Sequence, residues 1–178
     1  MDFTATGMES AMAKTVLGHI AGVLSSAWRR APAAVSGTRR DPAAFATMIY
    51  ASAKGPLLAV IRGEPFAGRS DAVCRAMDDC LIGRSLTFTP HADRAAHPEI
   101  RLILRFDPPA DLGQNRLCDD APTPAVPEEG RTRVTAAFCA DGALMAAADG
   151  WVGTRDPTDP RFRQMMGQLV RTLFEEQG

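Results

Sequence analysis

Residues 63–70 have the types and spacing of a phosphate-binding loop. Their sequence, Gly-Glu-Pro-Phe-Ala-Gly-Arg-Ser, fits the pattern G-x-x-x-x-G-K-[ST], with Arg69 in the position of the lysine. In such loops consecutive backbone N–H groups surround the phosphates, while the basic and hydroxyl side chains contact phosphate and Mg²⁺. The apolar run 100–107 ends in Asp, as does the strand that holds magnesium in these enzymes. Gly63, Gly68, Arg69 and Ser70 are therefore the candidate residues for phosphate or nucleotide binding.

Two residues inside this loop oppose phosphate binding. Pro65 has no N–H to donate, and Glu64 brings a negative charge to the place where the phosphates would lie. The C-terminal half of the chain also lacks the repeated βαβ units that normally surround such a loop. The competing interpretation is a strand-to-helix turn in which Phe66 packs in the core and Ser70 caps the helix. We favour the turn and keep nucleotide binding as an alternative.

A second polar group, formed by His91, Asp93, His97 and Glu99, contains side chains of types that bind metals. Their spacing matches no standard metal site, so we expect a solvated polar connection. No serine lies in the setting of a nucleophile elbow, and the histidines are too few for a Ser-His-Asp triad. We therefore expect no catalytic residue, no metal and no cofactor, and a protein that is not an enzyme.

Four cysteines could carry redox chemistry. A bridge between Cys118 and Cys139 would close a loop of about 22 residues and stabilise the fold by about 3 kcal/mol. Two reduced thiols in a cytosolic protein are the alternative. Cys74 and Cys80 are six residues apart on a predicted helix, on faces about 120° apart, so they cannot pair with each other. We expect Cys80 in the core and Cys74 as a free thiol.

The clearest structural pattern comes near the C-terminus. Apolar residues alternate with others along 134–139, as in a strand with one buried face, and Asp141-Gly142 predicts a hairpin turn into a return strand at 144–152. An Asp-Pro pair at 159–160 then begins a helix, with Asp at the N-cap and Pro at the first helical position. Seven large apolar residues form one stripe of this helix: Phe162, Met165, Met166, Leu169, Val170, Leu173 and Phe174.

Earlier in the chain the patterns predict strands at 57–62, 85–89 and 100–106 and a helix at 70–82. Residues 45–51 fit either a strand or the end of a short helix. In strand 100–106 two arginines share one face, which we expect to be partly wet. The predicted order is β-α-β-β-β-β-α. It favours an α+β fold, a two-layer sandwich of a mostly antiparallel sheet with two helices on one face.

The chain divides into an N-terminal extension, 1–40, and a single α+β domain, 41–178, that contains a Pro-rich connection, 107–130. Residues 31–41 have the composition of a linker. The extension fits a degenerate signal peptide or a short amphipathic helix that docks on a partner or a second copy. No apolar run reaches the ~20 residues of a membrane span. The net charge of −1 gives no reason to expect nucleic acid as a partner.

From residue 57 onward the sequence resembles an uncharacterised family of small bacterial envelope or lipoprotein-like proteins. The resemblance rests on these motifs: Gly63-Glu64-Pro65-Phe66, Phe106-Asp107-Pro108-Pro109, Leu117-Cys118, Ala137-Phe138-Cys139, Asp159-Pro160 before Phe162, and Leu173-Phe174. It implies that the phosphate-loop pattern is incidental and that Cys118 and Cys139 form a recurring, bridged pair. It implies no catalytic residue. The chain departs from the family at Ala27, which stands where the lipid-bearing Cys would be.

Together these features favour a non-enzymatic module of the cell envelope or periplasm that binds another protein or assembly. A phosphate- or nucleotide-binding protein built on residues 63–70 is one alternative. A cytoplasmic protein that docks or dimerises through its N-terminal helix is the other.

Overall fold

The computed structural model describes residues 34–63, 66 and 68–175. The predicted N-terminal helix or signal segment lies outside the described residues, and of the predicted extension 1–40 only residues 34–40 are described. The described residues form a six-stranded mixed sheet and three α-helices, and this confirms the predicted α+β class. From the strand at 57–62 onward the elements follow the predicted order β-α-β-β-β-β-α.

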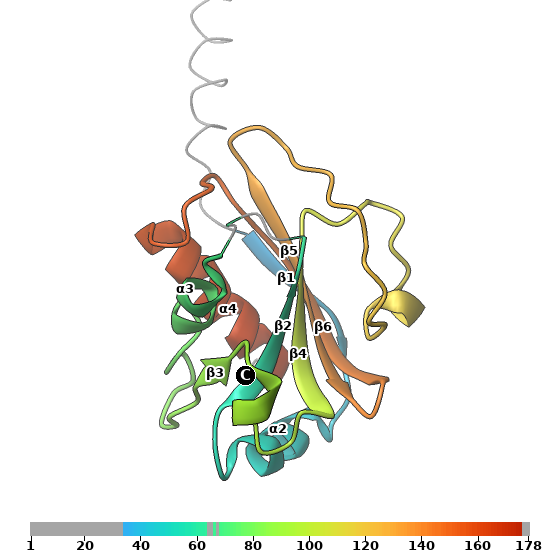
Figure 1. Ribbon diagram of the computed structural model, residues 1–178, viewed down its shortest axis with the longest axis vertical. Coiled ribbons are helices and arrows are strands. Elements are labelled where there is room, and N and C mark those ends of the chain that lie inside the picture. The colour runs from blue at the N-terminus through green and yellow to red at the C-terminus, as the bar shows by residue number, and fades with distance from the viewer. Residues whose placement is uncertain (1–33, 64–65, 67, 176–178) are drawn as a thin grey trace, which may run out of the picture. The chain divides into compact units, whose positions relative to one another are not determined.

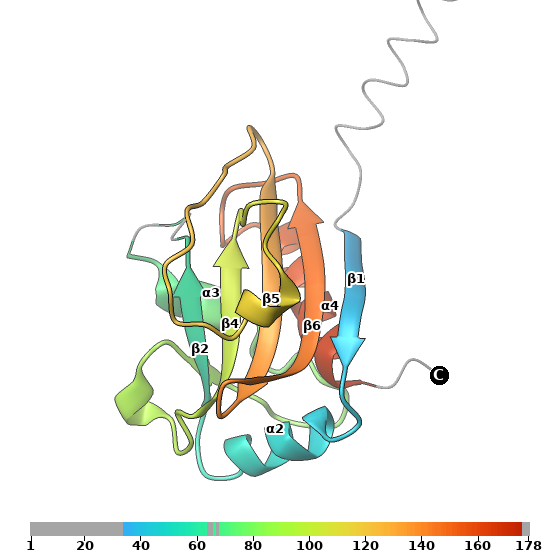
Figure 2. The ribbon, with the colours of Figure 1, turned by 90° about the vertical axis from the view of Figure 1, so that its right-hand side faces the viewer.

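The sheet has an antiparallel half and a parallel half (Figure 2). Across it the strands are β1 (Ala34–Arg40), β6 (Ala143–Val152), β5 (Thr132–Ala140), β4 (Ile100–Phe106), β2 (Leu57–Arg62) and β3 (Phe88–Thr89). The first four pair antiparallel, whereas β4, β2 and β3 run parallel. The predicted hairpin is confirmed for β5 and β6, where Asp141 and Gly142 both take positive φ.

All three helices bury their apolar sides in one core on one face of the sheet, two of them lying on that face and one across the end of the sheet (Figure 1). They are α2 (Ala44–Ser52), α3 (Ser70–Arg75) and α4 (Pro160–Phe174), and two short 3₁₀ helices, η1 (Ala92–Arg94) and η2 (Gln114–Arg116), lie in loops. The ambiguous segment 45–51 is thus helical. Within the described residues no helix has the length and apolar character needed to span a membrane.

Helix α4 begins where the sequence predicts. The Asp159 carboxylate accepts the N–H of Arg161 at 2.8 Å, and Pro160 is the first helical residue. The seven residues of the predicted apolar stripe are each at most 1% exposed. Gly150 of β6 allows this close packing, because a Cβ there would lie 2.9 Å from the sulfur of Met165.

The opposite face of the sheet is covered by the connection 107–130, which lies on the side away from the helices in Figure 1. Ile103 of β4 and Cys139 of β5 form a second, smaller core with Leu117 and Cys118 of the connection. The prediction of a partly wet face on β4 is therefore wrong at Ile103 and Arg105, which are 1% and 2% exposed.

Strand β1 is formed by residues that the composition assigned to a linker. It pairs antiparallel with β6, from Ala34 opposite Trp151 to Arg40 opposite Ala146. Its side chains are mostly exposed, as is usual on an edge strand, and it therefore lacks the apolar alternation of a half-buried strand. The sheet domain accordingly includes residues 34–40.

Helix α3 ends at Arg75, well before the predicted end at residue 82. Asp79 adopts a left-handed conformation with φ 54°, and the Asp78 carboxylate accepts the N–H of Phe88 at 2.9 Å. These local bonds turn the chain back toward β3 and compete with further helical turns. The predicted strand 85–89 is correspondingly shortened to two residues, parallel to β2.

Candidate functional site

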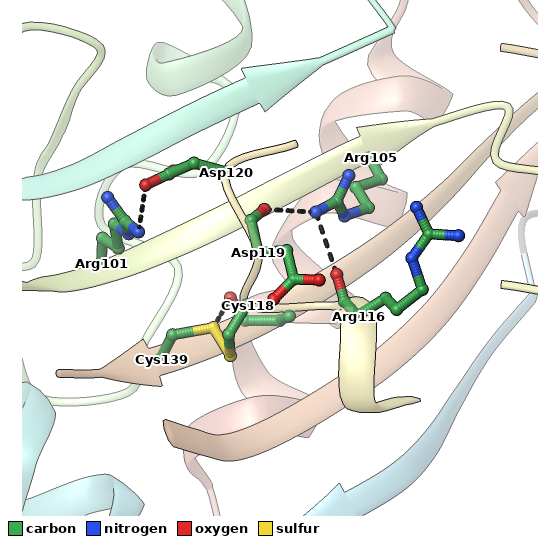
Figure 3. Close-up of a disulfide and its surroundings, with 8 residues drawn as sticks. Arg101, Arg105, Arg116, Cys118, Asp119, Asp120 and Cys139 are labelled. Carbon is green, nitrogen blue, oxygen red and sulfur yellow. Dashed lines mark hydrogen bonds and ion pairs between the residues drawn. A yellow bond between two sulfur atoms is a disulfide. The ribbon is translucent and has the colours of Figure 1, made fainter. Parts of the chain in front are cut away.

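A disulfide between Cys118 and Cys139 joins the connection to the outer face of β5 (Figure 3). The two Cα atoms are 5.8 Å apart, and both cysteines are buried. This confirms the predicted pairing. Because the bond fixes the middle of a long loop to a rigid strand, the residues around it are held against the sheet.

The buried guanidinium of Arg105 forms a second attachment beside the disulfide (Figure 3). It donates to the carbonyl oxygens of Arg116 at 3.1 Å and Asp119 at 2.6 Å, and to the hydroxyl of Thr123 at 2.6 Å. Burial, together with the nearby charge of Arg62, lowers the pKa of Arg105. Its contacts are backbone and hydroxyl oxygens, so its role is to shape the connection.

Two aspartates anchor other parts of the connection. Asp120 accepts from Arg101 at 2.9 Å and from Arg62 at 3.4 Å. Asp107, which is 1% exposed, accepts the N–H of Arg133 at 2.9 Å and pairs with Arg155 at 3.2 Å. Asp107 is the residue that the phosphate-loop interpretation would assign to magnesium, and here its carboxylate is occupied by protein donors.

The first residues of the connection cover a pocket of about 380 Å³ on the face of the sheet opposite the helices. We call it the sheet-face pocket. Its floor is formed by β1, β6 and β5. One row of paired residues runs from Ser36 through Asp149 to Thr135, and the Thr135 hydroxyl donates to the Asp149 carboxylate at 2.5 Å. The next row contains Trp151 and Arg133.

Apolar groups of the connection close the sheet-face pocket from above. They come from Pro108, Pro109, Leu112 and Leu117, with the Gln114 amide among them. Leu117 adjoins the bridged Cys118, so the disulfide determines where this roof lies. The pocket thus combines a polar floor, an indole wall and a fixed apolar roof.

A second, wider hollow of about 1320 Å³ lies where the end of β1 meets α2, the loop 81–84 and the end of α4. We call it the arginine groove, because Arg39, Arg40 and Arg84 line it, and Glu175 is the one acidic residue among its described lining residues. Ile82 in the groove is 86% exposed and Phe45 is 36% exposed. Such exposure of an isoleucine beside other apolar groups is typical of a binding surface.

The arginines of the arginine groove differ in the partners that their guanidinium groups have. Arg40 donates to the backbone carbonyls of Phe174, at 3.2 Å, and Glu175, at the end of α4. The Glu175 carboxylate accepts the N–H of Ile82 at 2.9 Å. Arg84 lies over the ring of Phe45, 5.3 Å from its centre, a contact that leaves the positive charge without an acidic partner within the described residues.

The predicted phosphate loop follows β2 and precedes α3, as expected, but Glu64, Pro65 and Ala67 lie outside the described residues. The Arg69 guanidinium pairs with the Asp156 carboxylate at 3.6 Å. Ser70 is the first residue of α3, and Arg69 occupies the N-cap position, so the prediction that Ser70 caps this helix is wrong.

The core role predicted for Phe66 is confirmed. Phe66 is 8% exposed and makes edge-on contacts with Phe106 and Phe162, at 5.7 and 5.3 Å between ring centres. Gly63 passes close under β4, where a Cβ would lie 2.5 Å from the Phe106 carbonyl oxygen. These contacts give the loop a structural role as a strand-to-helix turn.

The polar residues His91, Asp93, His97 and Glu99 do not gather into one cluster. His97 lies 3.0 Å from Glu99 and against the ring of Tyr50, while His91 lies 3.8 Å from Asp71. Among residues 34–63, 66 and 68–175, no cluster of three or more His, Cys, Asp or Glu side chains could hold a metal.

Cys74 is a free thiol, as predicted, whereas Cys80, which was expected in the core, is a free thiol that is only partly buried. Cys74, on α3, is 2% exposed, and Cys80 lies half-buried beyond the end of that helix. Burial, followed by the nearby Asp78 and Asp71 carboxylates, raises the pKa of the Cys74 thiol to about 12. Burial also raises the pKa of Cys80.

Sequence reasoning missed both the sheet-face pocket and the arginine groove. Their residues come from segments far apart in the chain, and the groove contains part of a strand that the composition assigned to a linker. The available signals were Trp151 at the end of a strand and the Arg39-Arg40 pair.

Comparisons with protein-family models, with curated proteins and with solved structures found no match. The resemblance to bacterial envelope proteins therefore stays a prediction based on the motifs.

Proposed function

We propose that this protein is a non-enzymatic module of the cell envelope that binds another protein through the arginine groove. The observation that carries this proposal is the exposed side chain of Ile82, at 86%, within a hollow that also contains Phe45 and three arginines. An apolar group so exposed is stabilised when a partner covers it, by about 25 cal/mol for each Å² removed from water.

The charge of the groove indicates the chemistry of the partner. Within the described part of the chain three arginines and one glutamate line the groove, and that glutamate already accepts a backbone N–H. A segment that carries apolar residues next to Asp or Glu would cover Ile82 and compensate Arg39 and Arg84 at the same time. Like charges placed opposite the arginines would be repelled, so the groove discriminates between partners.

The disulfide supports the envelope as the location. Structural disulfides persist in oxidising compartments such as the periplasm and are rare in the cytosol. The bond between Cys118 and Cys139 is buried under the connection and organises one whole face of the sheet. The resemblance of the motifs points in the same direction.

The groove supports protein binding better than the loop 63–70 supports nucleotide binding. Arg69, which takes the lysine position of the motif, is paired with Asp156, and Gly63 is packed against the carbonyl of Phe106. The arrangement leaves no basic side chain from the motif free for phosphate. Docking in the cytoplasm through the N-terminal helix differs from our proposal both in the binding surface and in location, and the thiol count below separates the two locations.

Site-specific photo-crosslinking in the native host tests the proposal. p-Benzoylphenylalanine replaces Ile82 in one strain and Tyr50, an aromatic residue 60% exposed and not part of the groove lining, in a matched control strain. We expect one protein to crosslink at position 82 and not at position 50, with an acidic-apolar segment as the crosslinked peptide. The Arg39→Glu/Arg84→Glu double variant should abolish this product.

Crosslinks that are equal at the two positions, or absent at position 82, would overturn the protein-binding proposal. Mass spectrometry of the same purified protein, without reductant, reports its location. Two free thiols, with Cys118 and Cys139 joined, support the envelope, whereas four free thiols support the cytoplasm.

A further inference from the structure

We propose that the sheet-face pocket binds a small polyhydroxylated ligand, a monosaccharide or disaccharide. The inference goes beyond protein binding and is independent of it, because the sheet-face pocket and the arginine groove are lined by different side chains of the fold, apart from Thr38. The pocket volume of about 380 Å³ lies in the range of roughly 300–1,000 Å³ that is usual for small-molecule sites.

The floor of the pocket offers both donors and acceptors at short spacing. Ser36, Asp149 and Thr135 lie opposite one another on three adjacent strands. Neighbouring strands are about 4.8 Å apart, so these groups repeat at a spacing that suits successive hydroxyls of a sugar ring. The Asp149 carboxylate has two oxygens and takes a hydrogen bond from Thr135 on only one of them in the described structure.

The walls of the pocket suit the C–H faces of such a ring. The indole of Trp151 lines one side, and the roof contributes prolines and leucines. The Arg131 guanidinium lies over the indole, 4.3 Å from its centre, and holds the ring in place. An apolar wall beside polar groups that fix orientation is the usual form of a small-molecule site.

The charges of the pocket argue against an anion and against a purely apolar ligand. Among the described lining residues Arg133 is the one guanidinium, and it shares the Glu128 carboxylate, at 3.7 Å, with Arg131, at 3.3 Å. Asp149 would repel a phosphate. An apolar ligand would cover the second oxygen of the Asp149 carboxylate and the Ser36 hydroxyl without bonding to them, at a cost of about 1–3 kcal/mol for each group.

The disulfide prepares the pocket for binding. It holds the roof through Cys118, the neighbour of Leu117, and the buried Arg105 fixes the carbonyls of the same segment. A roof that is already ordered loses little conformational entropy when a ligand enters, which favours binding. The sugar site is therefore expected to depend on the oxidised state.

Ligand titration of the full chain carrying Trp28→Phe tests this inference, because Trp151 is then the single tryptophan. The probes are glucose, N-acetylglucosamine, maltose and chitobiose, with inorganic phosphate and cyclohexanol as comparison compounds. Binding is followed by Trp151 fluorescence and, independently, by saturation-transfer NMR of the probe. We expect saturable binding of at least one sugar, with neither comparison compound bound.

Substitutions distinguish specific binding in the sheet-face pocket from nonspecific adsorption to the protein surface. Asp149→Ala is expected to weaken sugar binding about tenfold or more, since it removes a charged hydrogen-bond partner. Asp93→Ala, an exposed aspartate on η1, is the matched control and should leave the affinity unchanged. The Cys118→Ser/Cys139→Ser variant should also bind more weakly, whereas Ile82→Ser should bind normally and so distinguish this site from the groove.

Three results would overturn the inference. They are the absence of binding by every sugar in both measurements, equal binding of phosphate or cyclohexanol, and a sugar affinity that Asp149→Ala and Asp93→Ala leave equally unchanged.

Discussion

Gly63 shows how a residue of a ligand-binding motif can be required for packing alone. Its φ is +86°, a conformation that side chains rarely adopt, and a Cβ would lie 2.5 Å from the Phe106 carbonyl oxygen. Gly68 in the same loop also has a positive φ, +71°, but a Cβ there would meet no atom of the described residues within 4 Å. Substitution of Gly68 therefore tests backbone strain alone, whereas substitution of Gly63 adds a steric conflict with β4.

We predict that Gly68→Ala lowers the free energy of unfolding by about 1–2 kcal/mol, the usual cost of a left-handed alanine. Gly63→Ala should lower it by at least about 1 kcal/mol more, because the neighbouring strand must shift. Urea denaturation of both variants measures the difference. Equal losses would contradict the close approach to Phe106.

The Cys74 thiol makes stability depend on pH in the alkaline range. In the unfolded chain it ionises near its ordinary pKa of 9, whereas in the folded chain its pKa is about 12. The unfolded state therefore binds fewer protons above about pH 9, so the contribution of the neutral thiol, complete below that pH, is lost as the pH rises toward 12. We predict that the stability difference between the natural protein and Cys74→Ala narrows over this interval.

Denaturant titrations at a series of pH values check this prediction. Cys80→Ala is the control, since Cys80 is less buried and a smaller effect is expected from it. A difference between the natural protein and Cys74→Ala that stays constant with pH would show that the Cys74 thiol ionises normally in the fold.

At the scale of elements, the connection 107–130 acts as a covering layer although it contains only one short 3₁₀ helix, η2, within the described structure. We predict that the Cys118→Ala/Cys139→Ala variant loses about 3 kcal/mol of stability, because the unfolded chain regains the conformational entropy that the bridge removes. Trypsin should then cleave after Arg116 in the native buffer. Cys80→Ala should remain resistant to trypsin.

Arg105 gives a second prediction for the same element. Arg105→Met leaves the carbonyls of Arg116 and Asp119 without their buried donor, and we expect a loss of roughly 3 kcal/mol. Arg101→Met is the matched control on the same strand face. Its guanidinium pairs with the partly exposed Asp120, a bond typically worth about 0–1 kcal/mol. Thermal denaturation of the two variants should differ clearly, and similar losses would contradict the structural role of Arg105.

The elements that could be predicted from the sequence are those whose pattern is local. The strands β2 and β4, the β5–β6 hairpin and α4 have apolar periodicity and clear turn or cap residues. Strand β1 could not be recognised, because an edge strand paired on one side needs no apolar face. The end of α3 depends on bonds between Asp78 and Phe88, which are made only when β3 is in place.

At the scale of the whole molecule, the sequence predicted the fold class and the cysteine pair but neither pocket. Trp151 and Pro108 become neighbours only when the connection folds back over the sheet, and no local pattern encodes that return. Likewise Ile82 was placed at the end of a helix, where its exposure could not be foreseen. The candidate loop 63–70 was visible because its motif is contiguous in sequence.

Strand β1 is attached to the rest of the sheet by the strand pairing that is most distant in sequence among the described residues, that of Ala34 with Trp151. Loop closure over such a separation is costly in entropy, so β1 should dock last during folding and detach first from the native state. We predict that backbone amides of β1 exchange with deuterium before those of β4 and β5. Simultaneous exchange of all three strands would contradict this order.

Detachment of β1 would open both hollows together, since the strand lines the floor of the sheet-face pocket and one side of the arginine groove. A ligand bound in either hollow would favour the state in which β1 is attached to the sheet. The second ligand would then bind without the entropic cost of ordering this strand. The two surfaces would then strengthen each other's binding by the same factor, without any direct contact between their ligands.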